Sequence, residues 1–286
     1  MKTEAGVLYL CATPIGNLED MTYRAVRILK EADLIAAEDT RNSIRLLNHF
    51  DIHTPMTSYH EYNKIEKGHL LVKKLLEGSH IALITDAGTP GISDPGEELV
   101  RMCQEAGVLV TSIPGACACV TALSMSGMPT RRFCFEAFLP MDKKERREVL
   151  QGLTEETRTI VLYEAPHRLK KTLQELLEAL GDRQISILRE LTKRYESVFR
   201  TTLAEALRYY EVQDPRGEYV LVIEGRSRAE LEEKRQKSFL KMSVKDHVGL
   251  YEGQGMDRKA AMKQAAKDRG ISKREIYQAL LSEEEG

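Results

Sequence analysis

The stretch from Leu83 to Gly96, L-I-T-D-A-G-T-P-G-I-S-D-P-G, constrains the fold of this chain most. An apolar run over Ile81–Ile84 passes into a loop with three glycines and two prolines within ten residues. These residues bend and partly lock the backbone, and glycine lets a ligand approach it closely. Because ligands of α/β proteins bind at the carboxyl ends of strands, the loop, with Asp86 and Asp94, predicts a binding site. The alternative is an ordinary turn in which Ser93 or Asp94 caps the following helix.

Length and composition indicate a globular protein of about two domains. The chain has 286 residues, of which 42% are hydrophobic and 30% charged, so it can bury a sizeable core. The formal net charge of −2 means that any nucleic-acid contact must come from local charge. No apolar run approaches the roughly 20 residues that span a bilayer. We therefore expect no membrane contact and, since the first residues enter a strand without a signal-peptide pattern, a cytoplasmic protein.

The five cysteines predict neither disulfides nor a metal site. They stand at positions 11, 103, 117, 119 and 134, an odd number without the C-x-x-C spacing of a zinc site. Small, reduced and mostly buried cysteines are typical of a cytoplasmic protein. We therefore expect the chain to bind no metal.

Short apolar runs alternate with segments of helical spacing, which predicts an α/β fold. In the first part of the chain, strands are expected at residues 7–12, 34–37, 56–59, 81–84 and 108–112. Gly127-Met128-Pro129-Thr130 breaks a helix and is the predicted domain boundary. In the second part, strands are expected at residues 133–138, 159–163, 185–188, 197–201 and 219–223. The first of these is expected to be buried, and the close spacing after residue 190 predicts a partly antiparallel sheet.

Polar clusters follow several predicted strands. They occupy residues 38–42, 60–63, 164–168 and 189–193. Each cluster alone could be a solvated loop, but their repetition after successive strands favours one shared cleft.

A helix rich in small residues follows Ile113-Pro114-Gly115. Its small residues are Ala116, Ala118, Ala122, Ser124 and Ser126. Small side chains at a helix start let a bulky ligand lie against free backbone amides. Tight packing of the helix on a sheet explains the same composition, so both interpretations stay open.

The last part of the chain differs in charge. Residues 226–237 form a charge run that predicts a linker or a solvated helix. Residues 241–281 contain nine lysines and arginines against five acids. Helices at 256–267 and 273–281, with a glycine turn between them and Ser272 as N-cap, resemble a helix-turn-helix. Lys273 and Arg274 are the candidate RNA-binding residues there, and a packing appendage is the alternative.

Five segments together resemble the ribosomal RNA small-subunit methyltransferase I branch of the tetrapyrrole methylase superfamily. They are L-C-A-T-P-I-G-N-L-E-D at 10–20, A-E-D-T-R at 37–41, T-D-A-G-T-P-G-I-S-D-P-G at 85–96, I-P-G-A at 113–116 and Y-E-A-P-H-R at 163–168. The match extends over residues 6–225. The first and third strings are the most specific.

The resemblance implies a two-domain α/β tetrapyrrole-methylase-like fold with a cleft between the domains, plus a small helical C-terminal region. The expected domains are residues 1–126 and 127–228, followed by 229–286 as linker and basic helical region. The resemblance further implies a homodimer that uses S-adenosylmethionine to methylate a cytidine ribose 2′-oxygen in the decoding region of small-subunit ribosomal RNA. The substrate is either naked RNA or the assembled subunit.

Two other functions remain open at this point. One is a small-molecule (tetrapyrrole-like) or protein methyltransferase of the same fold, and the other is a non-catalytic rRNA-binding assembly factor. Members of the superfamily usually carry G-D-P-x-x-Y-G where this chain has D-A-G-T-P-G-I-S at 86–93. That difference counts against a porphyrin substrate. It leaves open which of Gly88, Thr89 and Ile92 touches the cofactor.

The resemblance and the strand-end clusters together give the candidate site residues. The cofactor-binding candidates are Pro14, Asp86, Gly88, Thr89, Ile92, Ser112, Ile113, Pro114, Ala116, Tyr163 and Ala165. The candidates for a general base are Asp39, His60, Glu61, Glu164 and Lys193, either as an ionised carboxylate or as a lysine whose pKa is lowered by burial. Arg41, Arg168 and Arg189 are candidate phosphate clamps, with structural salt bridges as the alternative. The modified nucleotide and the group that takes the proton stay open.

Overall fold

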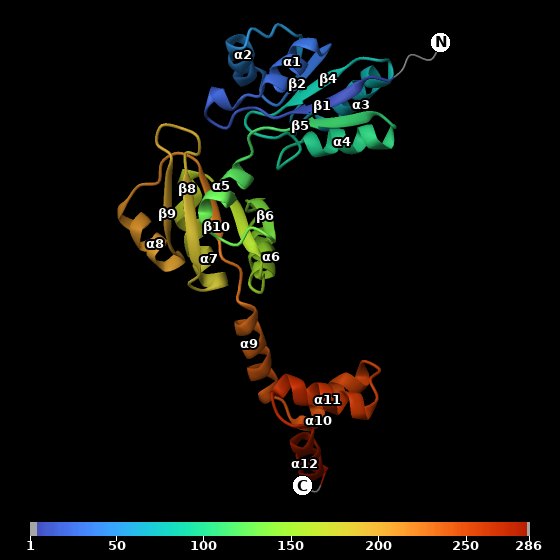
Figure 1. Ribbon diagram of the computed structural model, residues 1–286, viewed down its shortest axis with the longest axis vertical. Coiled ribbons are helices and arrows are strands. Elements are labelled where there is room, and N and C mark those ends of the chain that lie inside the picture. Colours follow the sequence, from blue (N-terminus) through green and yellow to red (C-terminus); the bar gives the residue numbers. More distant parts are fainter. Residues whose placement is uncertain (1–4, 285–286) are drawn as a thin grey trace. The chain divides into compact units, whose positions relative to one another are not determined.

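The computed structural model describes residues 5–284 and contains two five-stranded sheets and a helical C-terminal region (Figure 1). Contacts divide the chain into two compact units. One comprises the chain up to Gln151 together with Arg158–Glu224, and the other comprises Gly152–Thr157 together with the chain from Gly225 onward. The first unit carries both sheets. The expected α/β class with a small helical C-terminal region is confirmed.

The first sheet is entirely parallel, with strand order β3-β2-β4-β1-β5. Its strands are β1 (Val7–Cys11), β2 (Leu34–Ala37), β3 (Met56–Ser58), β4 (Ile81–Ile84) and β5 (Leu109–Ile113). Its helices are α1 (Tyr23–Glu31), α2 (Thr40–His49), α3 (Lys64–Leu76) and α4 (Gly96–Glu105), with a 3₁₀ turn at Leu18–Asp20. Because parallel strands end at the same edge, the loops after β4, β1 and β5 lie next to one another.

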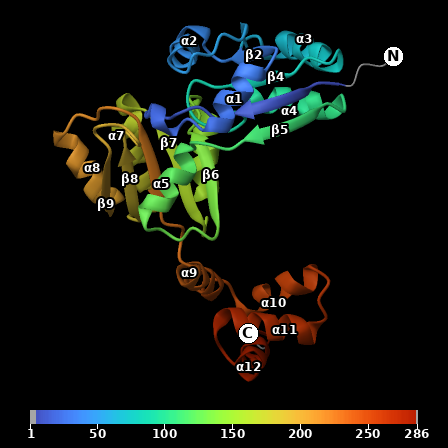
Figure 2. The same cartoon turned by 45° about the horizontal axis from the view of Figure 1, so that its top comes forward.

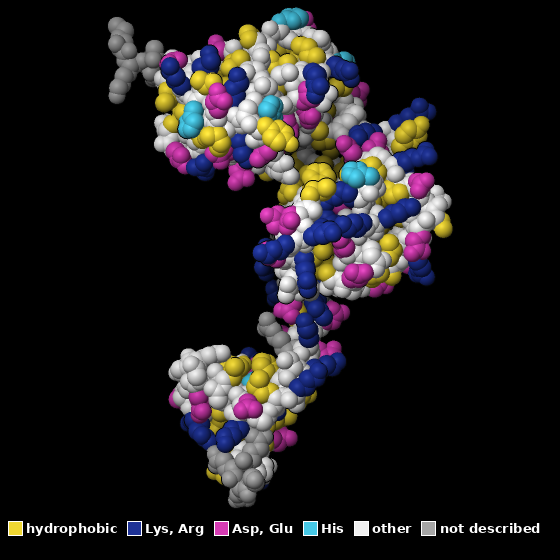
Figure 3. All heavy atoms as spheres, turned by 180° about the vertical axis from the view of Figure 1, so that it is seen from behind, with side chains coloured by type: hydrophobic (Ala, Val, Ile, Leu, Met, Phe, Trp, Pro, Cys, Tyr) yellow, Lys and Arg dark blue, Asp and Glu magenta, His cyan; other side chains and the backbone are white. Residues whose placement is uncertain are grey.

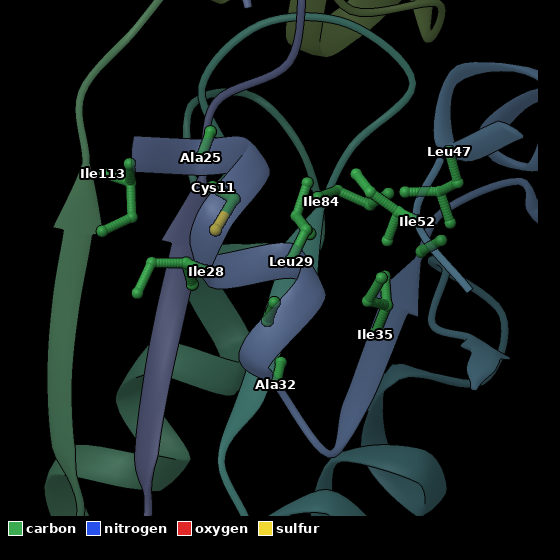
Figure 4. Close-up of a cluster of buried hydrophobic side chains, with 12 residues drawn as sticks. Cys11, Ala25, Ile28, Leu29, Ala32, Ile35, Leu47, Ile52, Ile84 and Ile113 are labelled. Carbon is green, nitrogen blue, oxygen red and sulfur yellow. The ribbon is translucent and has the colours of Figure 1, made fainter. Parts of the chain in front are cut away.

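Both faces of this sheet are buried, which explains why its strands are continuous apolar runs. On one face, Ile35 of β2 and Ile84 of β4 pack with Ile28 and Leu29 of α1 (Figure 4). The neighbouring side chain on β2, Ala36, belongs to the cluster on the opposite face, which contains residues of α3 and α4. This alternation follows from the two-residue period of a strand. Helices therefore cover both faces (Figures 1 and 2).

The second sheet is mixed, as expected, with strand order β6-β7-β10-β8-β9. Its strands are β6 (Phe133–Phe138), β7 (Thr159–Glu164), β8 (Gln184–Arg189), β9 (Ser197–Thr202) and β10 (Tyr219–Ile223). Only β6 and β7 are parallel, and β10 runs antiparallel to β7 and β8. Its helices are α5 (Ala118–Ser126), α6 (Lys143–Leu153), α7 (Pro166–Leu180) and α8 (Leu203–Val212).

The expectation that β6 is a buried strand is wrong. It is an edge strand, with Phe133 38% and Phe138 50% exposed. A register shift interrupts its pairing with β7 between Phe135 and Phe138, and Ala137 has a φ of 51°. An apolar sequence alone does not distinguish such an edge strand from a central one.

Helix α5 packs against the second sheet. Cys119, Ala122 and Leu123 share a buried cluster with residues of β7, β8 and β10. At the end of the helix, Ser186 and Arg200 donate hydrogen bonds to the carbonyl of Ser126, at 2.8 and 3.2 Å. These bonds satisfy a carbonyl that has no partner within the helix. The domain boundary after residue 126 stays a prediction. Helix α5, which precedes that boundary in the sequence, packs in the core of the second sheet.

The helical unit contains α9 (Arg228–Leu240), α10 (Val244–Gly253), α11 (Arg258–Arg269) and α12 (Lys273–Glu284). The last three pack around one apolar cluster. Gly270, with a φ of 68°, ends α11 in the left-handed conformation. Ser272 caps the next helix as expected, since its hydroxyl accepts from the Glu275 N–H at 3.2 Å and its own N–H donates to the Glu275 carboxylate at 2.7 Å. In residues 5–284, no helix has the length and apolar character needed to span a membrane.

The packing of α5 gives a stability prediction. We expect Leu123→Ala, which removes a side chain that is 5% exposed, to lower the free energy of unfolding by about 2–5 kcal/mol because it leaves a cavity against the second sheet. Val120→Ala on the same helix, where the side chain is 57% exposed, should change it little. Urea titration followed by circular dichroism measures both, and equal effects would contradict the packing described.

Candidate functional site

Hydrogen bonds join three loops at the carboxyl edge of the first sheet. Thr13 and Gly88 exchange two backbone hydrogen bonds, at 2.9 and 3.1 Å, which connects the loop after β1 with the loop after β4. The hydroxyl of Thr13 also donates to the carbonyl of Thr85 at 3.2 Å. The hydroxyl of Thr89 donates to the carbonyl of Ala116 at 3.0 Å, which adds the loop after β5. The three loops therefore form one continuous surface.

A pocket lies between this surface and the second sheet. Its empty space, including the opening to solvent, is about 650 Å³. From the first sheet's loops it is lined by Ile15, Ala87, Gly88, Thr89 and Ile92. Cys117 and Ala118, at the start of α5, and Tyr163, Leu191, Glu218, Tyr219 and Val220 complete the lining.

Two glycines have close-approach roles in these loops. Gly88 has a φ of 88°, in the left-handed region, and a Cβ atom there would lie 3.4 Å from Cγ2 of Ile15. A Cβ atom at Gly115 would lie 2.8 Å from Cβ of Ala12, closer than two such atoms pack. The close approach therefore requires glycine at position 115, whereas at position 88 glycine is favoured by the left-handed backbone conformation.

Asp94 shapes the loop after β4 and binds the first N–H of α4. Its carboxylate accepts hydrogen bonds from the N–H groups of Gly91, at 2.9 Å, and Gly96, the first residue of α4, at 2.7 Å. Pro95, at the N-cap position between them, has no capping side chain. The structural role weighed for Asp94 at the start of this helix is therefore what the structure contains. Ser93 itself is held at a φ of 67°.

Asp86 connects the same loop to the start of α2. Its carboxylate accepts from the N–H of Asp39 and from the side-chain amide of Asn42, both at 3.2 Å. The side chain is exposed and does not line the pocket. Its role in orienting a cofactor stays a prediction.

The other cofactor candidates divide into two groups. Gly88, Thr89, Ile92 and Tyr163 line the pocket, and Ala116 borders it through its hydrogen bond with Thr89. The remaining candidates do not line it: Pro14, Ser112, Ile113, Pro114 and Ala165. The Ile113 side chain, 3% exposed, packs instead into the core between α1 and the first sheet (Figure 4).

Tyr163 is fixed in the pocket wall. Its phenol oxygen accepts a hydrogen bond from the N–H of Cys119, in the first turn of α5, at 3.0 Å. Its ring contacts Phe135 and Phe138 edge-on, with centroids 4.9 and 5.6 Å away. Burial raises the pKa of the phenol far above its usual value, so it stays neutral.

None of the five base candidates lines the pocket. Asp39 is the N-cap of α2, and its carboxylate accepts from the backbone N–H and the guanidinium of Arg41. These hydrogen bonds lower the pKa of Asp39 to about 2, so it binds a proton weakly. Glu61 pairs with Lys64 on the surface, at 2.6 Å. His60 is held by Asn63, and its buried Nδ1 has no hydrogen-bond partner among residues 5–284.

Glu164 and Arg168 belong to a buried network. The Glu164 carboxylate, 1% exposed, accepts from the hydroxyl of Thr172 and the N–H of Ala165, and pairs with Arg168 at 3.4 Å. Arg168 also donates to the carbonyl of Leu139 at 2.6 Å. The structural salt bridge weighed for Arg168 is therefore what the structure contains.

Lys193 is held between two carboxylates. Its ammonium lies 3.0 Å from Glu190 and 2.8 Å from Glu218. Burial alone would lower the pKa of Lys193, but the hydrogen bonds to Glu218 and Glu190 outweigh it and the pKa is raised. The expectation that burial lowers the pKa of Lys193, as a base requires, is therefore wrong.

The remaining cationic candidates have different surroundings. The Arg41 side chain is 88% exposed but paired with Asp39. Arg189, at the end of β8, has a buried Nε without a partner among residues 5–284. Lys273 and Arg274 are exposed at the start of α12, in the helical unit. Across residues 5–284, no group of three or more His, Cys, Asp or Glu side chains is arranged to hold a metal ion.

Eight of the lining residues were not among the candidates from sequence: Ile15, Ala87, Cys117, Ala118, Leu191, Glu218, Tyr219 and Val220. Ile15 stands inside the T-P-I-G-N turn and could have been included with Pro14. Glu218 and Tyr219 lie at the start of β10, which is antiparallel to β7. A strand begins at the edge of the sheet where its antiparallel neighbours end. Glu218 and Tyr219 therefore lie at the same edge as the end of β7, which the sequence alone does not show.

This chain is similar in sequence to a known protein family and in fold to solved structures. The model of the family Tetrapyrrole (Corrin/Porphyrin) Methylases matches residues 7–207. A protein of Halalkalibacterium halodurans named Ribosomal RNA small subunit methyltransferase I is 51% identical over 96% of this chain and 95% of its own length. The protein of that name from Bacillus subtilis is 47% identical over 97% and 95%. Uroporphyrin-III C-methyltransferase from Thermus thermophilus, complexed with S-adenyl homocysteine, shares the fold with a TM-score of 0.54, at 19% identity over 76% of this chain and 97% of its own.

The buried network around Glu164 gives a prediction. We expect Glu164→Ala to lower the free energy of unfolding by about 3–5 kcal/mol, because it leaves the Arg168 guanidinium buried without its partner. Glu178→Ala, at an exposed position of α7, the helix that carries Arg168, is the matched control and should have little effect. Chemical denaturation measures both. A Glu164→Ala protein as stable as the parent would show that the network is not structural.

Proposed function

The chain belongs to the tetrapyrrole (corrin/porphyrin) methylase family, and on that premise we propose that it is an S-adenosylmethionine-dependent methyltransferase of small-subunit ribosomal RNA. The observation that carries the proposal is the 51% identity with a relative of that name over 96% of this chain. We further propose that the acceptor is the ribose 2′-oxygen of a cytidine in the decoding region. We expect the protein to act in the cytoplasm as a homodimer.

The pocket residues fit an adenosyl cofactor. The apolar side chains of Ile15, Ile92 and Leu191 suit a flat heterocycle, and Gly88 and Ala118 leave the backbone open to close contact. When bound, S-adenosylmethionine supplies an electrophilic methyl group on a positively charged sulfur. Of the lining residues, these five and Tyr163 would hold it.

The chain's own contribution is positioning. Hydrogen bonds fix the three loops to one another, and α5 fixes Tyr163, so the pocket wall is rigid before a ligand arrives. Holding two reactants in line can supply about 7–11 kcal/mol of the barrier. The apolar lining also excludes water from the reacting groups. Because a strongly anionic wall would stabilise the cationic donor before reaction, a largely neutral lining favours transfer.

The exposed side chains of this part of the chain favour a polynucleotide over a tetrapyrrole. Tyr62, in the loop after β3 at the edge of the first sheet, is 97% exposed, and an exposed ring can stack on a nucleobase. Lysine and arginine side chains gather on one face of the part that carries the second sheet (Figure 3). Such local positive charge suits phosphates although the net charge is −2.

Two measurements test the proposed function. Mass spectrometry of ribosomal RNA nucleosides from cells with and without the protein should show the loss of a single 2′-O-methylcytidine from small-subunit RNA. Purified protein should restore that methyl group on small subunits from the deletion strain when S-adenosylmethionine is added. An unchanged nucleoside pattern would contradict the assignment.

Cofactor binding depends on the conformation of Gly88. We expect Gly88→Ala to weaken binding of S-adenosylhomocysteine about tenfold or more, because a side chain at a φ of 88° costs ~1–3 kcal/mol and moves the pocket wall. Gly107→Ala is the matched control, because Gly107 has a φ of 72° with open space around it and lies outside the pocket. Isothermal titration calorimetry compares the two. Equal affinities would contradict the placement of the cofactor.

The helical unit should contribute to RNA affinity. We expect the double charge reversal Lys273→Glu and Arg274→Glu to weaken small-subunit binding and to reduce its salt slope by about two, since two phosphate contacts are lost. The same change at Lys73 and Lys74, exposed on α3, controls for net charge. Filter binding across a salt series measures the effect. Identical slopes for the two variants would exclude this role for α12.

A further inference from the structure

The pocket contains one carboxylate among the residues that line it. That residue is Glu218, immediately before β10, and the other lining side chains are apolar or carry a hydroxyl or thiol. The Glu218 side chain is 79% exposed, so it lies where a macromolecular substrate can reach it. A carboxylate at the open side of a neutral pocket is placed to take up a proton from an incoming hydroxyl.

Two neighbouring groups fix this carboxylate. The Lys193 ammonium lies 2.8 Å from Oε2 of Glu218 and 3.0 Å from Oε1 of Glu190. The Glu218 backbone N–H donates to Oε1 of Glu190 at 2.9 Å. Both the backbone and the side chain of Glu218 are therefore held by the loop after β8.

That loop has an unusual backbone. Glu190 and Thr192, on either side of the lining residue Leu191, have φ values of 53° and 66°. Gly217, next to Glu218, has a φ of 79°, and a Cβ atom there would lie 2.5 Å from Cγ of Glu190. Positive φ values are strained at residues other than glycine, such as Glu190 and Thr192, and such strain concentrates at functional sites. This backbone conformation places the Glu190 side chain against Gly217 and the backbone of Glu218.

Lys193 also connects this cluster to the first sheet. A Cβ atom at Gly16 would lie 2.4 Å from Cγ of Lys193, so the lysine stem packs directly on the turn after β1. The next residue back along that turn, Ile15, lines the pocket. The Glu218 carboxylate is thus positioned relative to both walls.

We propose that Glu218 is the general base that accepts the proton of the acceptor hydroxyl, and that Lys193 is its positioning residue. The inference rests on the proposed function. As the acceptor oxygen bonds to the methyl carbon, the methyl–sulfur bond breaks, its electron pair stays on sulfur, and the hydroxyl proton moves to the Glu218 carboxylate. The cationic donor becomes a neutral thioether, and the carboxylate later releases the proton to water.

The other candidates fit this role less well. Asp39 does not line the pocket, and Glu164 is buried in the Arg168 network. Lys193 has a raised pKa and is therefore a protonated donor. Besides Lys193, the charged groups near Glu218 are Glu190 and, beside Glu190, Arg189.

Glu218→Gln tests the base. We expect single-turnover methylation of small subunits to fall about 10²- to 10⁴-fold, the usual contribution of a general base, with S-adenosylhomocysteine affinity by calorimetry unchanged. The residual rate should rise about tenfold per pH unit, since hydroxide then replaces the carboxylate, whereas the parent rate should be flat near neutral pH. Glu211→Gln, at an exposed position on α8, should match the parent.

The positioning role has its own test. The Lys193 ammonium lies 2.8 Å from Oε2 of Glu218, so Lys193→Met should slow single-turnover methylation while S-adenosylhomocysteine affinity by calorimetry stays unchanged. Lys193→Arg keeps a cation that can hold the carboxylate and should restore part of the rate. A Lys193→Met protein as fast as the parent, or a Lys193→Arg protein no faster than Lys193→Met, would overturn the positioning role.

The outcomes separate the two claims. A parent protein that fails to methylate small subunits refutes the proposed function. A parent that methylates them, with Glu218→Gln equally fast and equally pH-independent, refutes the general base and leaves the function standing. Loss of S-adenosylhomocysteine binding in Glu218→Gln also refutes it, because the residue would then serve the cofactor.

Discussion

The rest of the site depends on the two backbone hydrogen bonds between Thr13 and Gly88. The central position of β1 between β4 and β5 brings the loops that carry them side by side. Both bonds join backbone atoms, so they depend little on the side chains of the two loops. The exception is position 88, where a φ of 88° favours glycine. The Thr89–Ala116 hydrogen bond then adds the third loop. These hydrogen bonds define one wall of the pocket without any residue of the second sheet.

The second sheet supplies the opposite wall through its topology. Strand β7 ends, and its antiparallel neighbour β10 begins, at the same edge. This brings Tyr163 and Glu218 to the pocket although they are distant in sequence. Helix α5 couples the walls, because its first turn lines the pocket while Ala122 and Leu123 are buried against the second sheet. Tight packing therefore explains the small residues beyond the first turn, and ligand access at the start of the helix stays a prediction.

Much of the fold could be predicted from sequence, but of the residues that line the pocket only Gly88, Thr89, Ile92 and Tyr163 were candidates. Strand bounds were found within one or two residues because buried strands are short continuous apolar runs. The order of strands in each sheet could not be predicted, because it depends on contacts between segments that are distant in the sequence. Glu218 was missed as a pocket residue for that reason. Glu164 and Arg168 follow a strand just as Gly88 does, yet they pair internally. A polar cluster at a strand end has the same sequence whether its side chains face a pocket or a core.

The most direct test of this account is a crystal structure of the protein with S-adenosylhomocysteine. The account predicts the ligand between Gly88 and Thr89 on one side and Ala118 and Tyr163 on the other, with its sulfur toward the open side where Glu218 lies. A ligand bound elsewhere, or a pocket closed in that complex by movement of the loop after β4, would contradict it.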